Sequence, residues 1–340
     1  MDDVSDPKIA VVIPCYRVTK QILDVLARIG PEVAAIYVVD DACPDHTADL
    51  VERAVHDPRV HVMRRRRNGG VGAATVTGMT AAVKAGADVL VKIDGDGQMD
   101  PSLIARFVRP IVEGRADYTK GNRFFSPEFV QRMPALRIFG NGILSFMNKV
   151  SSGYWTIFDP TNGYVAIHAA VFSALPPEKL ATGYFFESDV LFRLNLLRAN
   201  VLDIPLRSTY GDELSGLRVG KVIAPFIWRH LCNFAKRVVY SYFIRDFSIA
   251  SLYLLSGVPL FLFGAIYGAY EWDVHVRAGM TASAGTVMVA ALPVITGFQL
   301  ILSFLAYDVA SVPRAAVHPL LASDHHGQAS GADRAGPHAA

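Results

Sequence analysis

The chain has 340 residues, of which 51% are hydrophobic, and its formal net charge is only +2 at pH 7. This length accommodates one large domain with an appendage, and the near-neutral charge argues against a nucleic-acid-binding surface. Three scattered cysteines without a C-x-x-C spacing exclude a disulfide framework and a cysteine zinc site, and they indicate a reducing compartment.

The N-terminus does not resemble a secretory signal. It reads MDDVSDPK, which is acidic where a signal peptide is basic, and the apolar run behind it is short and ends at Pro14. We therefore predict a first strand here, and we expect the N-terminal part of the chain to stay in the cytosol.

Short apolar runs alternate with amphipathic stretches over the first 120 residues. This pattern is typical of βαβ units and predicts an α/β domain with a mostly parallel sheet. The predicted strands are IAVVI (9–13), AIYVVD (35–40), VHVM (60–63) and VLVKID (89–94). The predicted helices lie near 19–29, 47–55, 72–85 and 101–113. Ligands bind outside the carboxyl ends of strands in such folds, so the residues after each run are the first site candidates.

The pattern from 121 to 220 is less regular. We predict helices near 136–150 and 186–198 and a strand near 201–205. With the first half, these elements complete one catalytic domain over residues 1–220.

The last third of the chain changes character. Residues 247–270 and 278–307 carry no charge, and each stretch exceeds the roughly 20 apolar residues that cross a bilayer. We predict a two-helix transmembrane anchor over 247–307, with a short loop at 271–277. The preceding segment, 221–246, mixes basic and aromatic residues, which is typical of an amphipathic helix in the membrane interface.

Charge asymmetry predicts the orientation of this anchor. The basic residues lie before the first span, whereas the loop holds Glu271, Asp273 and only Arg277. By the positive-inside rule, both termini and the catalytic domain face the cytosol, and the protein is a multi-pass protein of the cell membrane. The tail 308–340, rich in Ala, Gly, Ser and His, is predicted to be a disordered cytoplasmic tail.

The sharpest chemical signal is Asp94-Gly95-Asp96, directly after the apolar strand VLVKI. Two carboxylates one residue apart reach a single hard cation, whose remaining ligands are substrate phosphates, and Gln98 adds a third oxygen nearby. A nucleotide diphosphate needs such a cation both to bind and to leave as an anion. The alternative is a polar turn in which Asp and Gly serve the turn geometry.

Three further motifs precede the D-x-D motif along the chain, in this order: VVIPCYR, VVDDACPDHT and NGGVGAATVTG. With the D-x-D motif, they make the sequence resemble the GT-A-fold glycosyltransferases of family 2. The resemblance is strongest to the branch acting on polyprenyl phosphates, the dolichol-phosphate mannose synthase type. It spans about 8–215 and extends to the two-helix anchor of bacterial members.

The resemblance implies a donor site. Pro14 and Tyr16 would line the nucleotide base, and Asp40 and Asp41 would contact the base or the ribose. Mg²⁺ or Mn²⁺ would be held, with the diphosphate, by Asp94, Asp96 and Gln98. The family often reads P-x-Y-N-E after the first strand, but Arg17-Val18 stand here in place of Asn-Glu, so the identity of the base stays open.

The glycines of NGGVG expose backbone N–H groups at a helix start but lack the pattern of a Walker loop or a Rossmann fingerprint. We interpret the stretch as a packing turn near the phosphates, with direct ligand contact as the alternative. The preceding run Arg64 to Arg67 is either a solvated face or an attraction for anionic headgroups.

The resemblance also implies acceptor-side residues. Arg123 falls in a segment like the family's G-S-R, Arg137 matches a second phosphate-contacting arginine, and Asp159 begins a D-x-x-(S/N)-G-(F/Y) segment. Asp189 aligns with an acidic residue of the family. The alternatives are surface arginines and, for Asp189 and Glu187, acids at a helix N-terminus that favour the dipole.

These expectations combine into one reading: inverting transfer of a hexosyl group from a UDP- or GDP-sugar to a polyprenyl phosphate at the cytoplasmic membrane face. The residues expected to carry catalysis are Asp96, Asp189, Arg123, Arg137 and Asp159. One alternative is a same-fold enzyme that adds the sugar to a glycan or glycolipid hydroxyl, with Asp189 as the base. Another is a non-catalytic, membrane-tethered nucleotide-binding scaffold. A homo-oligomer is compatible with either, and nucleic acid is not an expected partner.

Overall fold

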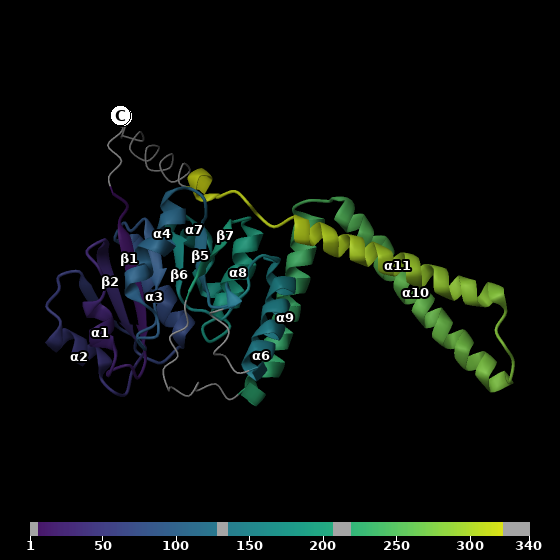
Figure 1. Ribbon diagram of the computed structural model, residues 1–340, viewed down its shortest axis with the longest axis horizontal. Coiled ribbons are helices and arrows are strands. Elements are labelled where there is room, and N and C mark those ends of the chain that lie inside the picture. Colours follow the sequence, from purple (N-terminus) through teal and green to yellow (C-terminus); the bar gives the residue numbers. More distant parts are fainter. Residues whose placement is uncertain (1–5, 128–134, 207–218, 322–340) are drawn as a thin grey trace, which may run out of the picture. The chain divides into compact units, whose positions relative to one another are not determined.

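The computed structural model describes residues 6–127, 135–206 and 219–321 (Figure 1). Contacts divide the chain into two compact units. The first comprises residues 1–233 together with 313–340, and the second comprises residues 234–312. The second unit is therefore an insertion whose two ends both join the first unit.

The first unit is built on a seven-stranded sheet with the order β3-β2-β1-β4-β6-β5-β7. Among these strands, only β6 runs antiparallel to its neighbours. The strands are β1 (Ile9–Cys15), β2 (Val33–Asp40), β3 (Val60–Arg64), β4 (Val89–Lys92), β5 (Tyr118–Asn122), β6 (Val165–His168) and β7 (Val201–Pro205). The predicted mostly parallel α/β sheet is confirmed.

Helices cover both faces of this sheet, because successive side chains of a strand point to opposite faces. Ile13 and neighbouring apolar residues form a core with Ile22 and Phe107, whereas the next residue back, Val12, contacts Gly78 on the other face. The helices of the first unit are α1 (Ile22–Ala27), α2 (Thr47–Ala54), α3 (Val71–Lys84), α4 (Ile104–Val112) after the 3₁₀ turn η1 (Pro101–Leu103), α6 (Ala135–Ser152), α7 (Ala169–Ala174), η2 (Pro177–Lys179) and α8 (Phe186–Leu196).

All of the helices and strands predicted for residues 1–220 are present, with ends shifted by a few residues. The prediction missed β5, β6 and α7. The reason is visible in β5, whose sequence YTKGN contains no apolar run although all five residues are buried. Its polar side chains are satisfied by partners elsewhere in the fold, which periodicity does not reveal.

The strand order contains a switch point, where the chain reverses direction across the sheet. The chain runs outward from β1 through β2 to β3, and then returns to place β4 on the opposite side of β1. The crevice at such a switch point, beyond the carboxyl ends of the strands, is where open α/β sheets bind ligands. Here it is bordered by the residues that follow β1, β2 and β4.

The segment after the insertion docks on the first unit. The buried carboxylate of Asp117 accepts hydrogen bonds from the backbone N–H groups of Val317 and His318 at 2.9 and 2.8 Å. The His318 ring lies 2.8 Å from the same carboxylate and stacks on His168 with centroids 4.2 Å apart. The prediction of disorder from residue 308 onward is therefore wrong for 308–321, because a buried acid binds the backbone here. Residues 322–340 lie outside the described part.

The second unit contains a helical hairpin, α10 (Ile249–Ala278) and α11 (Ala284–Ala310). Both helices are long and apolar enough to cross a membrane, with mean hydropathies of 2.0 and 2.1 over their most apolar windows. The predicted loop at 271–277 is wrong, since α10 continues through it and ends at Gly279, whose φ of 66° suits a glycine cap. The connection is the shorter segment 279–283.

The two helices of the hairpin approach closely at glycines. A Cβ added at Gly297 would lie under 3.0 Å from the backbone of Phe261 and Gly257, so only glycine fits there. Such small-residue contacts are a common way for membrane helices to associate.

Near the base of the hairpin, the Arg237 guanidinium forms a buried two-point ion pair with Asp308, at 2.6 and 3.0 Å. Arg237 lies in α9 (Val219–Val239), which is followed by a π-helical turn, η3 (Tyr240–Ile244), within the segment predicted to be amphipathic.

Candidate active site

The first border of the crevice is the end of β1. Pro14 is buried within the strand, and Tyr16 follows it with 43% of its surface exposed. Arg17 has a positive φ of 58°, and its guanidinium lies 5.4 Å from the Tyr16 ring centroid. The tyrosine therefore offers an exposed aromatic face at the position predicted to line a nucleotide base.

The second border holds two buried acids at the end of β2. Asp40 accepts hydrogen bonds from the backbone of Cys43 at 2.7 Å and of Ala48 at 3.0 Å, so it shapes the turn into α2. Asp41 accepts from the backbone N–H groups of Gly69 and Gly70, and it also forms an ion pair with Arg65. Asp41 thus holds the NGGVG turn beside the crevice.

The third border is the D-x-D motif after β4. Both Asp94 and Asp96 are partly exposed, and Gln98 is exposed. A Cβ at Gly95 would lie 3.1 Å from Val18 and 3.5 Å from the Cys15 sulfur, so the motif packs tightly against the end of β1. The Asp96 carboxylate accepts a hydrogen bond from the Gln98 backbone at 3.0 Å. The predicted metal residues therefore share one short turn at the edge of the crevice.

A buried lysine supports this turn. The Lys92 ammonium, at the end of β4, lies 2.9 Å from the Asp94 carboxylate and 3.1 Å from that of Glu187 on α8. It also donates to the Gly163 carbonyl at 3.3 Å. Burial by itself would lower the pKa of Lys92, but Asp94 and Glu187 outweigh it and hold that pKa above its ordinary value.

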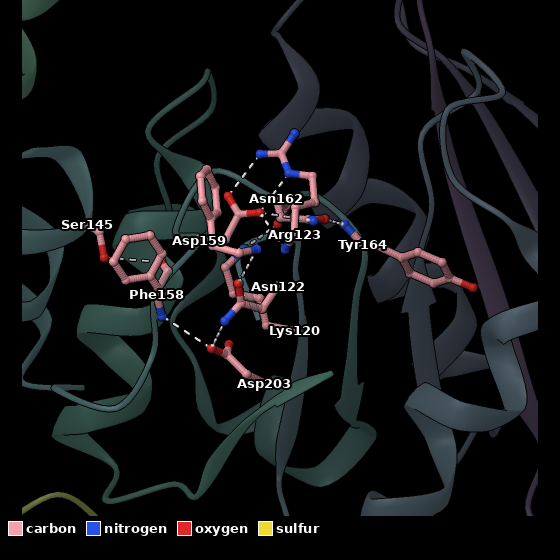
Figure 2. A network of polar contacts seen from close by, with 10 residues as sticks. Lys120, Asn122, Arg123, Ser145, Phe158, Asp159, Asn162, Tyr164 and Asp203 are labelled. Atoms are coloured by element: carbon pink, nitrogen blue, oxygen red, sulfur yellow. Dashed lines mark hydrogen bonds and ion pairs between the residues drawn. The ribbon is translucent and has the colours of Figure 1, made fainter. Parts of the chain in front are cut away.

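An arginine–aspartate pair lies beyond the end of β5 (Figure 2). The Arg123 guanidinium donates to both carboxylate oxygens of Asp159, at 2.7 and 2.9 Å, and its backbone N–H donates to one of them at 3.2 Å. Burial opposes ionisation of Asp159, yet Arg123 holds its pKa below the ordinary value. Two predicted acceptor-side residues thus form one unit.

The neighbouring strand residues brace the loop that carries Asp159. Lys120 donates to the Asn162 carbonyl from a fully buried position, and burial lowers its pKa to about 8. Asn122 donates to Asp203 at 2.7 Å, and the Phe158 backbone donates to the same acid at 3.2 Å (Figure 2). Lys92 and Lys120 both pair in register with Val165, so two buried lysines hold adjacent carbonyls of one loop.

Asp189 lies two residues after Glu187 on α8 but has different partners. Its carboxylate accepts from Arg193 and from the Ala181 backbone, each at 3.0 Å, and from the Asn233 amide at 3.3 Å. The structure therefore connects Glu187, rather than Asp189, to the D-x-D turn. The side chain of Arg137 lies outside the described part, so its predicted role stays a prediction.

Sequence reasoning missed the roles of Lys92, Lys120 and Asp203. A lysine inside an otherwise apolar run, as in VLVKI, was an available signal, because a buried lysine is almost always paired. Its partner is Glu187, which the sequence offers as a site residue or as an acid at a helix start, without indicating that it pairs with this lysine.

Comparison with known proteins identifies the family and supports the fold. The family model described as glycosyl transferase family 2 matches residues 10–175. A UDP-N-acetylglucosamine–dolichyl-phosphate N-acetylglucosaminyltransferase of Methanococcus voltae is 28% identical over 223 residues, which cover 62% of this chain and 88% of the relative. A polyprenol monophosphomannose synthase of Mycolicibacterium smegmatis is 31% identical over 205 residues, covering 58% and 76%.

Among solved structures, a glucosyl-3-phosphoglycerate synthase of Mycobacterium tuberculosis, crystallised with Mn²⁺ and UDP, superposes with a TM-score of 0.50. It is 18% identical, with 68% of this chain and 80% of that chain covered, so it supports the fold alone. The predicted GT-A fold and the predicted enzyme class are confirmed. The chain belongs to glycosyl transferase family 2.

Proposed function

We propose that this protein transfers a hexosyl group, with inversion, from a UDP- or GDP-sugar to a polyprenyl phosphate at the cytoplasmic face of the membrane. The observation that carries the proposal is the joint presence, on one sheet, of the D-x-D turn after β4 and the Arg123–Asp159 pair beyond β5, with β6 between these two strands. Both relatives described above bear names that place the sugar on a lipid phosphate.

The donor side fits a divalent cation. Asp94 and Asp96 supply hard oxygen donors on a partly exposed turn, with Gln98 beside them. Within the described residues, no group of three or more His, Cys, Asp or Glu could hold a metal ion. Two carboxylates suffice for Mg²⁺ or Mn²⁺ when phosphate oxygens and water complete the shell. When bound, the cation would neutralise charge on the diphosphate leaving group.

The chain's own residues would bind and orient both substrates. Tyr16 offers its exposed ring to the nucleotide base, while Asp41 holds the glycine turn near the phosphates. Arg123, kept rigid by Asp159, would position the acceptor phosphate with Arg137, because a guanidinium matches phosphate oxygens. One acceptor oxygen then forms a bond to the anomeric carbon as the bond from that carbon to the diphosphate breaks.

A phosphate acceptor needs little help from a base. The second pKa of a phosphomonoester is about 6, so its oxygen is largely ionised near pH 7. A hydroxyl acceptor would need a carboxylate to take its proton. Asp189, the residue expected to do so, already accepts hydrogen bonds from three partners, which include the Arg193 guanidinium. Because these hydrogen bonds already occupy the Asp189 carboxylate, a phosphate acceptor, which needs little help from a base, is favoured over a sugar hydroxyl.

The hairpin of α10 and α11 would anchor the enzyme in the cell membrane. The basic residues Arg229, Lys236 and Arg245 precede the first span, and by the positive-inside rule they would keep the catalytic unit and both termini in the cytosol. Membrane attachment suits an acceptor whose polyprenyl chain stays in the bilayer.

The proposal is tested by radiolabelled transfer with the full chain in detergent, varying UDP- and GDP-hexoses, the metal, and the acceptor. Asp96→Ala should abolish transfer while the protein still folds, and Glu113→Gln, a surface change, serves as the control. Arg137→Ala should raise the KM for polyprenyl phosphate and lower kcat by about tenfold to a hundredfold, as expected for one lost hydrogen bond to a charged group. Donor binding should barely change.

Three results would each contradict a part of this proposal. Full activity of Asp96→Ala, or of the wild type in excess EDTA, would refute the metal role. A soluble sugar that accepts as well as polyprenyl phosphate would replace the lipid acceptor with a glycan. If Arg137→Ala weakens the donor as much as the lipid, this arginine binds the diphosphate instead.

A further inference from the structure

The buried ammonium of Lys92 links the D-x-D turn to other parts of the fold and has no role in the mechanism above. The Lys92 ammonium is only 1% exposed, so it does not reach a ligand in the crevice. Its neighbours are two carboxylates and one carbonyl, supplied by Asp94, Glu187 and Gly163. These three partners belong to three different parts of the chain: the D-x-D turn, α8 and the loop before β6.

The ammonium and the Asp94 carboxylate pack closely against Gly163. A Cβ added at Gly163 would lie under 3.0 Å from both the Lys92 nitrogen and one Asp94 oxygen. Glu187 is itself buried, with 9% of its side chain exposed, and its carboxylate lies 3.1 Å from the Lys92 ammonium. The lysine is therefore shared between Asp94 and Glu187 in a fixed geometry.

This sharing determines how much negative charge Asp94 presents to a cation. An ammonium paired with Asp94 alone would cancel the charge that a metal needs. A second carboxylate on the same ammonium offsets that effect. The carboxylates of Asp94, Asp96 and Glu187 with the one ammonium carry a net charge of −2, which matches a divalent cation.

We infer that Glu187 and Lys92 are positioning residues that set the charge and orientation of Asp94 for a divalent cation, although neither touches it. The inference rests on the proposed metal role of Asp94 and Asp96 and extends it to a buried pair on β4 and α8.

The test is direct binding of Mn²⁺ to the full chain in detergent, followed by the loss of the free-ion electron paramagnetic resonance signal. The titration uses Mn²⁺ alone, with UDP, and with GDP. Glu187→Gln keeps the length of the side chain and removes its charge, and it should weaken Mn²⁺ binding by roughly three- to tenfold, as expected for one unit charge at a distance of several ångströms. Glu187→Asp keeps the charge and should bind more tightly than Glu187→Gln. If Glu187 acted only through packing, Glu187→Gln, which keeps the length of the side chain, would bind Mn²⁺ more tightly than Glu187→Asp.

A double variant keeps the test decisive if a single variant unfolds. Replacing Lys92 and Glu187 together by Met removes a buried ion pair, an exchange that is often neutral for stability. It restores the net charge of −2 on Asp94 and Asp96, so Mn²⁺ binding should return toward that of the wild type. Glu113→Gln on the surface is the control for a lost carboxylate, and thermal unfolding of each variant reports its folding.

The outcomes separate this inference from the metal role itself. If the wild type binds Mn²⁺, Asp96→Ala loses it, and Glu187→Gln binds as well as the wild type, only the inference fails. The same holds if the double variant binds more weakly than Glu187→Gln. If the wild type binds no Mn²⁺ with or without a nucleotide, the metal role and the inference fall together.

Discussion

Asp117→Asn should detach the segment that follows the membrane hairpin. The Asp117 carboxylate is fully buried and accepts hydrogen bonds from the backbone of Val317, His318 and Asn200, the last at 2.7 Å. Burial alone would raise its pKa, but these donors together with the His318 ring lower it, so the group stays ionised. Every partner in the cluster is arranged to donate to an anion.

The magnitude follows from the loss of acceptors. An asparagine side chain has one oxygen and turns an N–H₂ group toward backbone donors, so at least two hydrogen bonds are lost. Each hydrogen bond to a charged group contributes about 1.5–3 kcal/mol, so the loss of two predicts a decrease of about 3–6 kcal/mol in the free energy of unfolding. That is a large share of the roughly 5–15 kcal/mol that stabilises a typical domain.

The assay is denaturant unfolding of the full chain in detergent, together with limited proteolysis that reports cleavage within 313–321. Asp88→Asn is the matched control, because Asp88 is exposed and its carboxylate accepts from the Lys8 backbone at 2.8 Å. We expect faster cleavage and lower stability for Asp117→Asn than for the control. Equal stability of the two variants, or unchanged protection of 313–321, would refute the reasoning.

Three further predictions concern other parts of the molecule. Gly297→Leu should separate α10 from α11, because a Cβ at this position would lie under 3.0 Å from the backbone of Phe261. Engineered cysteines, one on each helix, should then cross-link less than in the control variant Ser303→Leu, which changes a partly exposed side chain. Burial lowers the pKa values of His168 and His230 from 6.5 to about 4. The neutral rings therefore stabilise the fold fully above about pH 6.5, and this stability should be lost as the pH falls toward 4. His230→Gln should make the free energy of unfolding depend less steeply on pH in this range. An unchanged slope would contradict this prediction. Finally, a cysteine introduced at Ala278 should be labelled from outside the cell, with no labelling of a tail cysteine, and the reverse pattern would overturn the proposed orientation.

The class of fold follows from the sequence alone, and so does the set of polar residues expected at one edge of the sheet. Short apolar runs ending in PCYR, DDAC and DGDGQ are local features, and the parallel sheet then brings the ends of those runs to one edge. The two candidate membrane helices were also evident, because hydropathy over about 20 residues depends on composition alone. The exact ends of these helices were not evident from the sequence, because α10 stays helical through the charged residues Glu271, Asp273 and Arg277.

Only the tertiary structure decided which charged groups pair. The strand YTKGN is buried because Lys120 and Asn122 find partners 42 and 81 residues further along the chain, and no local pattern encodes such partners. The same holds for Lys92, whose link to Glu187 spans 95 residues, and for the tail, which is ordered at 317–318 because Asp117 lies 200 residues before it. A buried charge is stable only with its partner, and the identity of that partner is a property of the folded chain.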